Sequence, residues 1–533
     1  MHEPASRLHH PQQASPEPTA TAPRSFRSIL FPQASDEAMR ETQQPPEFFH
    51  DLNLDQVVNT ITANWDEFDL SALFYTPLKD VDSIVYRQEV MRDLEEEATM
   101  AAVQSFNEQM RIALRYLKHS QEVHYKEQSE GWFLESARLY CEAVQHLTRD
   151  LKDLPLQSRG LQSLREFLAT YVRSSAFEKL FAETKNLTDE LSAIRYCLVI
   201  KGNHVTVRNY DGEEDYSVSL EETFKKFRRG EVKDYRRTFK GSGMNHVEAR
   251  ILERVAWLNP RTFDSLEKFR SEHAKYPHET ILRFYREIHF YIAYLDYMNG
   301  FRHTGLSFCY PQVSDEIKEE FVQDAFDPAL AYSLIGEQRT VVPNGFYLND
   351  PERIIVVSGP NQGGKTTFAR MFGQLHYLAS LGCPVPGSQA RLFLFDHLFT
   401  HFEREEDITN LRSKLEDDLV RMRRILERAT PNSIIIMNEV FSSTTIKDSI
   451  NLSKKVLKQI SQLDLLCVFV TFLDELASFN EKTVSMVSTV DPEDPAIRTY
   501  HLERRPADGL AYAIAIAQKH RVTYEQLKGR INK

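Results

Sequence analysis

The sequence predicts a chain in two parts: a mainly α-helical core and lever domain that carries a small β-containing insert, and after it an α/β domain with a mostly parallel sheet. Two observations predict this division. From Phe48 to Met298, apolar residues recur at spacings of three and four, which is the period of helices packed along their lengths. After residue 318, short apolar runs such as "RIIVVSG", "SIIIMNE" and "LLCVFVTF" alternate with helical stretches, which is typical of βαβ units.

The composition is that of a soluble globular protein. Of the 533 residues, 41% are hydrophobic and 27% are charged. Apolar runs such as "LLCVFV" are too short to cross a bilayer, and the chain shows no secretory signal. The five cysteines are never spaced as CxxC, which favours a reducing compartment and argues against a zinc site or a disulfide framework. We therefore expect a cytoplasmic protein that does not bind membranes.

The first two segments differ in their periodicity. Residues 1–26 are rich in Pro, Ala, Ser, Gln and His and lack apolar periodicity, so we expect them to be disordered. Residues 27–195 are expected to form the helical core and lever, and residues 246–317 its returning helices. The periodic positions are Val103, Phe106, Met110, Ala113 and Leu117; Leu161, Leu164, Leu168 and Tyr171; and Ile281, Phe284, Ile288, Tyr291, Leu295 and Met298. The same period fits an ordinary helical bundle, and periodicity alone does not decide between a bundle and a long lever.

Residues 196–245 are predicted to form a clamp-like basic insert. The run "YCLVIKGNHVTVRNYD" contains two strand-like stretches around "KGN", which predicts a hairpin. It is followed by a basic stretch interleaved with aromatic residues, a composition that suits contacts with a nucleic-acid backbone. A solvated helix face is an equally good interpretation. The net charge of −12 means that any contact with nucleic acid must come from such a local patch. The candidate DNA-binding residues are Lys225, Lys226, Arg228, Arg229, Arg236 and Arg237.

A glycine-rich loop in the last part of the chain predicts binding of ATP with Mg²⁺. The stretch "RIIVVSGPNQGGKTTFARM" fits a strand, a loop and a helix, and it matches the pattern G-x-x-x-x-G-K-[ST]. Glycines let backbone N–H groups wrap the phosphates, while the lysine reaches the β- and γ-phosphates and the threonine hydroxyl ligates Mg²⁺. The residues predicted to contact the nucleotide are Gly359, Pro360, Asn361, Gln362, Gly363, Gly364, Lys365, Thr366 and Thr367.

The loop and the segments after it resemble the MutS family, the mismatch-repair ATPases of the ABC type. "SGPNQGGKTT" is similar to that family's "TGPNMGGKST", "EDITNLRSKLEDDL" to its signature region, "SIIIMNEV" to its Walker B strand and "VTFLDEL" to its switch segment. The resemblance covers about residues 318–530. It implies that residues 318–533 form an ABC-type P-loop ATPase domain with dimerisation helices at its C-terminal end.

The resemblance also implies roles for individual residues. Glu439 would act on the attacking water, and Thr366, Asn438 and Glu439 would hold Mg²⁺. Ser413 of one subunit would close on the γ-phosphate held by the other, so a homodimer is implied. Val341 falls where the family stacks an aromatic residue on the adenine. The predicted catalytic set is therefore Lys365, Ser413 and Glu439.

Two departures from the family pattern bear on the chemistry. Asn438 replaces an aspartate and loses its charge, which predicts weaker binding of Mg²⁺. Phe472 replaces a histidine that touches the γ-phosphate in the family, and a phenylalanine cannot donate a hydrogen bond there. Together they predict slow hydrolysis, and an inactive site that only binds nucleotide is the alternative.

The favoured function is an ATP-driven DNA clamp. Mismatch-repair members carry an N-terminal domain that inserts a Phe-x-Glu motif into the mispair, and we expect this chain to be a short form without it. The lever and the basic insert would then contact the DNA backbone without reading its sequence, in mismatch repair or recombination. Two alternatives remain open: an ATPase of the same mechanics that acts on RNA or ribosomes, and a scaffold that dimerises on binding ATP with little hydrolysis.

Overall fold

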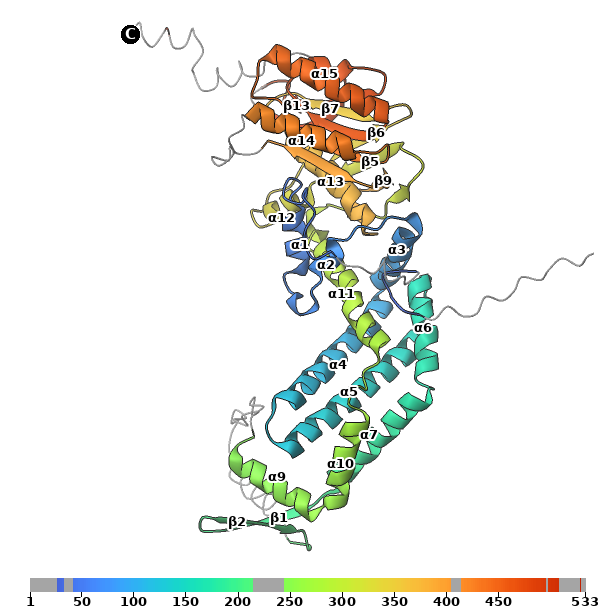
Figure 1. The fold of residues 1–533 in the computed structure, drawn as a ribbon, viewed down its shortest axis with the longest axis vertical. Coiled ribbons are helices and arrows are strands. Elements are labelled where there is room, and N and C mark those ends of the chain that lie inside the picture. The colour runs from blue at the N-terminus through green and yellow to red at the C-terminus, as the bar shows by residue number, and fades with distance from the viewer. Residues whose placement is uncertain are drawn as a thin grey trace, which may run out of the picture.

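The computed structural model describes residues 26–32, 42–213, 244–403, 414–494, 497–507 and 528. The molecule is elongated, with an α/β part at one end and an arm of long helices that ends in a two-stranded hairpin (Figure 1). Within the described residues, no helix has both the length and the apolar character needed to cross a membrane.

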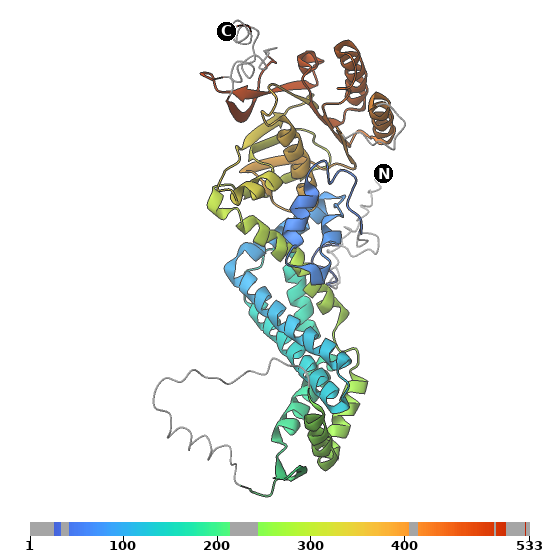
Figure 2. The same cartoon turned by 90° about the vertical axis from the view of Figure 1, so that its left-hand side faces the viewer.

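The helical part precedes most of the sheet structure in the chain. Its helices are α1 (Leu54–Thr62), η1 (Asp66–Phe68), α2 (Ser71–Phe74), α3 (Val81–Glu95), α4 (Glu97–Glu122), α5 (Lys126–Lys152), α6 (Arg159–Tyr171), α7 (Ser175–Ala193), α9 (His246–Leu258), α10 (Pro260–Glu272), α11 (Glu279–Asn299) and η2 (Arg302–Thr304). Helices α4 and α7 run away from the α/β part, whereas α5, α10 and α11 run back toward it (Figure 2).

The predicted helical periodicity is confirmed in the long helices. In α4, Val103, Phe106, Met110 and Ala113 are all buried, as are the predicted core positions of α11 from Ile281 to Leu295. Side-chain caps fix the starts of α3, α6 and α7, because Asp80, Ser158 and Ser174 each accept a hydrogen bond from a backbone N–H three residues later. Residues 26–32, in contrast, contain no helix.

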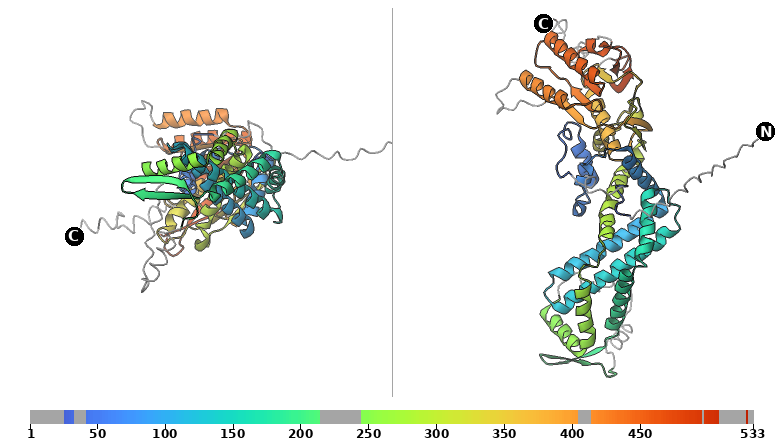
Figure 3. Two further views of the ribbon diagram at one scale, coloured as in Figure 1. Left: turned by 90° about the horizontal axis from the view of Figure 1, so that it is seen from below. Right: turned by 45° about the vertical axis from the view of Figure 1, so that its right-hand side comes forward.

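The predicted hairpin is also present. Strands β1 (Tyr196–Lys201) and β2 (His204–Asn209) pair antiparallel, with Lys201 opposite His204. Gly202 in the connecting turn has a φ of 60°, a conformation that glycine adopts without strain. The further views in Figure 3 place the hairpin at the end of the arm farthest from the α/β part. The six candidate DNA-binding residues that follow it lie outside the described residues.

The α/β part contains two main sheets and a short pair of strands. Its elements are β3 (Phe308–Cys309), β4 (Gln312–Ser314), β5 (Glu320–Ala325), α12 (Pro328–Ile335), β6 (Asn344–Leu348), β7 (Ile354–Ser358), α13 (Lys365–Ser380), β8 (Val385–Pro386), β9 (Gln389–Phe393), β10 (Leu398–Phe402), α14 (Lys414–Arg428), β11 (Ile434–Asn438), α15 (Ile446–Leu463), β12 (Leu466–Val470), η3 (Asp474–Ser478), β13 (Thr483–Val490) and β14 (Arg498–Arg504).

The larger sheet confirms the prediction of a mostly parallel arrangement. Its six strands lie in the order β10-β11-β12-β7-β13-β14, and only the β13–β14 pair is antiparallel. Strands β7 and β12 are buried along their whole lengths, because helices cover both faces of the sheet. Ile354 and Val356 pack in one core cluster with α14 and α15, while Ile355 and Val357 pack in the other with α13.

Helix α13 lies between the larger sheet and the smaller one. The smaller sheet has the order β4-β9-β5-β6 and is mixed, since β4 pairs parallel and the others antiparallel. On one side, the ring of Phe372 in α13 lies 5.1 Å from that of Phe346 in β6. On the other, Gly373 approaches Ile436 of β11 so closely that a Cβ atom there would come within 2.8 Å of its side chain. Almost every residue of α13 is buried as a result.

Candidate nucleotide-binding site

The glycine-rich loop lies at the carboxyl end of β7, in the middle of the parallel sheet. Residues 359–364 connect β7 to α13, and Gly364 is the N-cap of that helix. In open α/β sheets, ligands bind beyond the carboxyl ends of the strands. The first turn of α13 also leaves backbone N–H groups without partners in the helix, and these groups attract anions. The loop therefore lies at the place in the sheet where α/β proteins generally bind anionic ligands.

The glycines of the loop are required by its shape and by a close neighbour in β13. Gly359 and Gly364 have φ values of 109° and 92°, which side chains other than glycine rarely adopt. A Cβ atom on Gly359 would come within 2.8 Å of the carbonyl oxygen of Ser488. The Ser488 hydroxyl in turn donates a hydrogen bond of 2.5 Å to the carbonyl of Gly363. Ser488 thus anchors the loop to the sheet.

The Lys365 ammonium group is folded back over the loop. Its Nζ donates to the carbonyl oxygens of Gly359 and Pro360, both at 3.0 Å, and lies 3.4 Å from Oδ1 of Asn361. Burial lowers the pKa of Lys365, and the charge of Glu439 opposes this shift. The cation is therefore held above the loop that would wrap the phosphates, where a phosphate anion would replace neutral carbonyls as its partner.

Two of the three candidate metal ligands are in contact at the end of β11, and the third is the next residue in the chain. The hydroxyl of Thr366, in the first turn of α13, donates a hydrogen bond of 3.0 Å to Oδ1 of Asn438. Glu439 follows directly with a φ of 54°, and its backbone N–H donates to the carbonyl of Val470 at 2.9 Å. A hydroxyl, an amide oxygen and a neighbouring carboxylate are oxygen ligands of the kind that Mg²⁺ prefers. These residues therefore fit Mg²⁺, although Asn438 supplies no charge.

One residue next to the loop was missed by the sequence analysis. Tyr500 of β14 has an exposed ring and a φ of 60°, and its Cδ1 lies 3.9 Å from where a Cβ on Gly364 would be. Asn344 fixes this strand, since its Nδ2 donates to the Tyr500 carbonyl at 3.0 Å and its Oδ1 accepts from the Leu502 N–H at 2.8 Å. No local pattern marks Tyr500, because only the antiparallel β13–β14 pairing brings it to the loop.

Val341, the candidate adenine contact, lies in the coil before β6. It is half-buried and packs against the larger core cluster. Val341 is an aliphatic side chain on this segment, and the exposed Tyr500 ring lies near Gly364 together with Leu502. Since the Val341 segment continues into Asn344, which holds Tyr500 in place, both groups belong to one local unit.

Two further residues that the sequence analysis singled out are Phe472 and Ser413. Phe472 follows β12 and its side chain is 49% exposed. Ser413, predicted to act across a dimer, lies outside the described residues.

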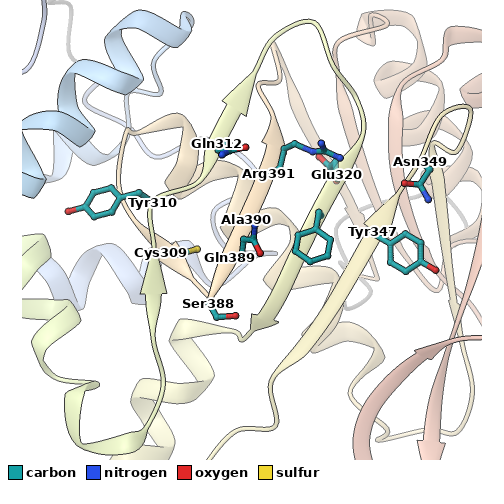
Figure 4. A pocket seen from close by; sticks show the side chains of 11 residues that line it. Cys309, Tyr310, Gln312, Glu320, Tyr347, Asn349, Ser388, Gln389, Ala390 and Arg391 are labelled. Carbon is teal, nitrogen blue, oxygen red and sulfur yellow. The ribbon is translucent and has the colours of Figure 1, made fainter.

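A separate pocket opens on the outer face of the smaller sheet (Figure 4). It has a volume of about 580 Å³, and Phe321, Tyr347 and Arg391 from three neighbouring strands line its floor. None of the candidate nucleotide-site residues in the described part of the chain lines this pocket. The pocket is therefore not part of the site at the loop.

The segment that contains the glycine-rich loop is similar to known proteins. Residues 355–525 match the family model described as MutS domain V. The chain is therefore similar to the MutS family over this segment. Over 213 residues it is 28% identical to the DNA mismatch repair protein MutS of Geobacillus sp. (strain WCH70), a match that covers 39% of this chain and 24% of the relative.

Two further relatives match over shorter lengths of the chain. The MutS protein of Petrotoga mobilis (strain DSM 10674 / SJ95) is 28% identical over 181 residues, which are 33% of this chain and 22% of that protein. DNA mismatch repair protein Msh3 of Mus musculus is 30% identical over 166 residues, 31% of this chain and 15% of that protein. The matches thus span less than a quarter of each relative. The family model begins within β7, so it includes Lys365, Asn438 and Tyr500 but not Val341 or the helical arm.

Proposed function

We propose that this chain binds ATP with Mg²⁺ at the loop between β7 and α13. The observation that carries the proposal is the contact of Thr366 with Asn438, because it puts a hydroxyl and an amide oxygen side by side at the start of the phosphate-binding helix. The loop N–H groups and Lys365 would hold the β- and γ-phosphates. Bound Mg²⁺ would supply positive charge to neutralise the phosphates. Val341 and Tyr500 would contact the base.

The second element of the proposal is hydrolysis of the bound ATP. Glu439 would accept a hydrogen bond from the attacking water and orient it toward the γ-phosphate. Asn438 leaves the metal site less negative than an aspartate would, and the exposed Phe472 offers no donor to the γ-phosphate. Hydrolysis would therefore be slow. The same two residues favour a second candidate function, a scaffold in which ATP gates dimerisation with little turnover.

A homodimer is the third element. In the ABC-type arrangement that the sequence resembles, each site is completed by the signature serine of the other subunit, here Ser413. Two copies related by a two-fold axis would then share two nucleotides. The chain would be divided as the sequence suggests: residues 27–195 and 246–317 as core and lever, 196–245 as the clamp insert, and 318–533 as the ATPase domain.

Nucleic acid is the fourth element, and DNA is the preferred substrate. The matched relatives are named as DNA mismatch repair proteins. The basic stretch of the insert, residues 225–240, follows the hairpin at the tip of the arm in the sequence. Lys225, Lys226, Arg228, Arg229, Arg236 and Arg237 would contact the backbone without reading sequence. RNA bound in the same way is the alternative that the basic composition also permits.

The test is the ATPase activity of the purified protein, measured alone and with homoduplex DNA, mispaired DNA, branched DNA and RNA. We expect ATP hydrolysis that requires Mg²⁺ and that is stimulated by DNA. Each of the two substitutions, Lys365→Ala and Glu439→Ala, should abolish this activity. Lys447→Ala, an exposed lysine of α15, is the matched control and should behave as wild type. Activity that survives Lys365→Ala would rule out the assigned site. Stimulation by RNA alone would favour the RNA alternative, and ATP-dependent dimerisation without turnover would favour the scaffold.

A further inference from the structure

Helix α13 connects the nucleotide site directly to the helical arm. It begins with Lys365 and Thr366 at the loop and ends at Ser380. At that far end, the carbonyl of Ser380 accepts a hydrogen bond of 2.8 Å from the backbone N–H of Leu78, just ahead of α3. The hydroxyl of Tyr377 donates to the carbonyl of Phe74 at 2.9 Å. A displacement of the loop end of α13 would therefore be felt where the arm begins.

Arg87 of α3 is the side chain that ties this end of α13 to the arm. Its Nη1 donates to the carbonyl of Leu381 at 3.0 Å, and its Nε donates to the carbonyl of Leu30 at 3.2 Å. The guanidinium also lies over the rings of Phe31 and Phe290, 5.0 Å from each centroid. Only 1% of Arg87 is exposed. A fork of donors at fixed spacing is needed to reach two carbonyls at once, and arginine is the side chain that provides it.

The second carbonyl belongs to an N-terminal strap, which we define as residues 26–31. Side chains of α3 and α11 hold its backbone: Tyr86 donates to the Ser28 carbonyl at 2.9 Å and Tyr291 to the Ile29 carbonyl at 2.7 Å. The carboxylate of Glu287 accepts hydrogen bonds from the Ile29 N–H at 2.9 Å and from the Ser28 hydroxyl at 2.8 Å. Ile29 is completely buried. The strap is thus fixed across α3 and α11 at the root of the arm.

We propose that Arg87 and the N-terminal strap form a latch that transmits the nucleotide state of the loop, through α13, to helices α3 and α11 of the arm. The proposal rests on the proposed function, since it needs ATP to bind at the loop. Leaving the guanidinium in this buried place without one of its carbonyls would leave a charge poorly solvated. The end of α13, the strap and α3 are therefore held together, and a shift of one requires a shift of the others.

The strap connects elements that are far from it in the sequence. It lies far from α11 and α13 along the chain, yet it contacts both α11 and, through Arg87, the residue after α13. Arg87 thus acts as a positioning residue, because it touches neither the loop nor the candidate metal ligands. Loss of the latch should uncouple the arm while the nucleotide site stays intact.

The test uses the full chain and two latch variants, Arg87→Lys and a chain that begins at residue 32. Lysine keeps the charge but has no fork, so Arg87→Lys can serve one carbonyl and not both. The control is Arg286→Lys, an arginine of α11 that donates to the carbonyls of Phe68 and Asp69, which lie outside the strap. Circular dichroism establishes that each variant is folded. Two quantities are then measured: the Kd for ATP with Mg²⁺, and the hydrogen exchange of α3 and α11 with and without ATP.

We expect ATP to change the exchange of α3 and α11 in the wild type and in Arg286→Lys. In the folded latch variants the Kd should stay within about threefold, equivalent to about 0.7 kcal/mol, while the response of the arm is lost. An arm response of wild-type size in the latch variants would overturn the latch. So would a wild type that binds ATP without any arm response, and in that case the proposed nucleotide site still stands. A wild type that binds no ATP would overturn both.

Discussion

The hydroxyl of Thr366 donates a hydrogen bond of 3.0 Å to Oδ1 of Asn438. This contact joins the first turn of α13 to the last residue of β11, although β12 lies between β11 and β7 in the sheet. An oxygen from each of two separate segments thus reaches one point beside the glycine-rich loop. At this point a neutral amide stands where a carboxylate would add charge.

Restoring that charge should change the requirement for Mg²⁺. In Asn438→Asp, we expect the Mg²⁺ concentration for half-maximal ATP hydrolysis to fall about tenfold, because a carboxylate attracts a divalent cation more strongly than an amide. The control is Asn432→Asp, which adds the same charge at an exposed position before β11. An unchanged Mg²⁺ dependence would mean that Asn438 is not at the metal.

The shape of the loop gives a second prediction. Gly359→Ala should weaken ATP binding at least tenfold, since Gly359 has a φ of 109° and a Cβ there would come within 2.8 Å of the Ser488 carbonyl. Gly131→Ala, in the second turn of α5, is the matched control because a Cβ at Gly131 would have no heavy atom within 4 Å. That control should bind ATP normally and be slightly more stable, by about 1 kcal/mol. Equal Kd values for the two variants would show that the loop tolerates a side chain.

Tyr500 is expected to contribute to the affinity for the base. Removing the ring in Tyr500→Ala should raise the Kd for ATP about five- to tenfold, which is the value of about 1 kcal/mol typical of an aromatic contact. Tyr500→Phe keeps the ring and should bind as wild type. Tyr210→Ala, another exposed tyrosine, at the far end of the arm, controls for a general effect. If inorganic triphosphate loses affinity as much as ATP does, Tyr500 acts on the loop rather than on the base.

The basic insert gives a prediction about salt. Replacing Lys225, Lys226, Arg228 and Arg229 by glutamine should abolish DNA binding and flatten its dependence on salt, because fewer counterions would be released. The matched control replaces Arg111, Lys118, Arg250 and Lys268, four basic residues with exposed side chains on helices of the arm. Fluorescence anisotropy with labelled duplex, at a series of salt concentrations, measures DNA binding by the insert variant and by the control. The DNA-clamp proposal fails if the insert variant binds like the control.

Glu287, which holds the strap, should make the stability of the protein depend on pH. Burial raises its pKa from 4.5 to about 7, although Arg283 and Arg87 oppose this shift. The folded state then binds the proton more tightly than the unfolded chain, so this group stabilises the fold below pH 4.5 and the contribution is lost as pH rises through about 7.

The measurement compares urea unfolding of the wild type and Glu287→Gln at pH 5 and pH 8. Glutamine keeps an acceptor oxygen for Ser28 and Ile29 but does not titrate. We expect the wild type to lose up to about 3 kcal/mol relative to the variant over this range. Parallel pH profiles for the two proteins would show that Glu287 keeps an ordinary pKa.

The sequence could predict the elements that are determined by residues close to one another in the chain. Strands β7 and β12 are continuous apolar runs because both faces of the sheet are covered, and the loop is marked by the spacing of Gly359, Gly364 and Lys365. The hairpin turn at Gly202 is equally local. The pairing of Thr366 with Asn438 needed the resemblance to a family, because no spacing connects two residues on different strands and helices.

The residues that escaped prediction act through contacts between distant segments. Ser488 reaches the loop because β13 pairs with β7, with Val487 opposite Ser358. Tyr500 reaches it through the β13–β14 pair, whose register shifts between Ser488 and Val490. Residues 27–31 belong to the span expected to be helical and Phe26 to the segment expected to be disordered, but together they form the strap, whose hydrogen bonds go to side chains of α3 and α11. Arg87 looks like an ordinary polar position of α3 in the sequence, and its burial depends on the strap and on the end of α13.

The length of α13 is itself a constraint. Its 16 residues set a span of about 24 Å between the loop and the strap at 1.5 Å per residue. One inserted residue would turn one end by about 100° relative to the other, and with every side of the helix packed there is no exposed face to absorb that turn. The length of the helix thus fixes the distance between the parts that it connects. Substitutions inside the helix can be compensated by repacking, whereas a change in its length cannot. Insertions and deletions in this chain should accordingly be tolerated in the turns of the arm and excluded from Lys365–Ser380.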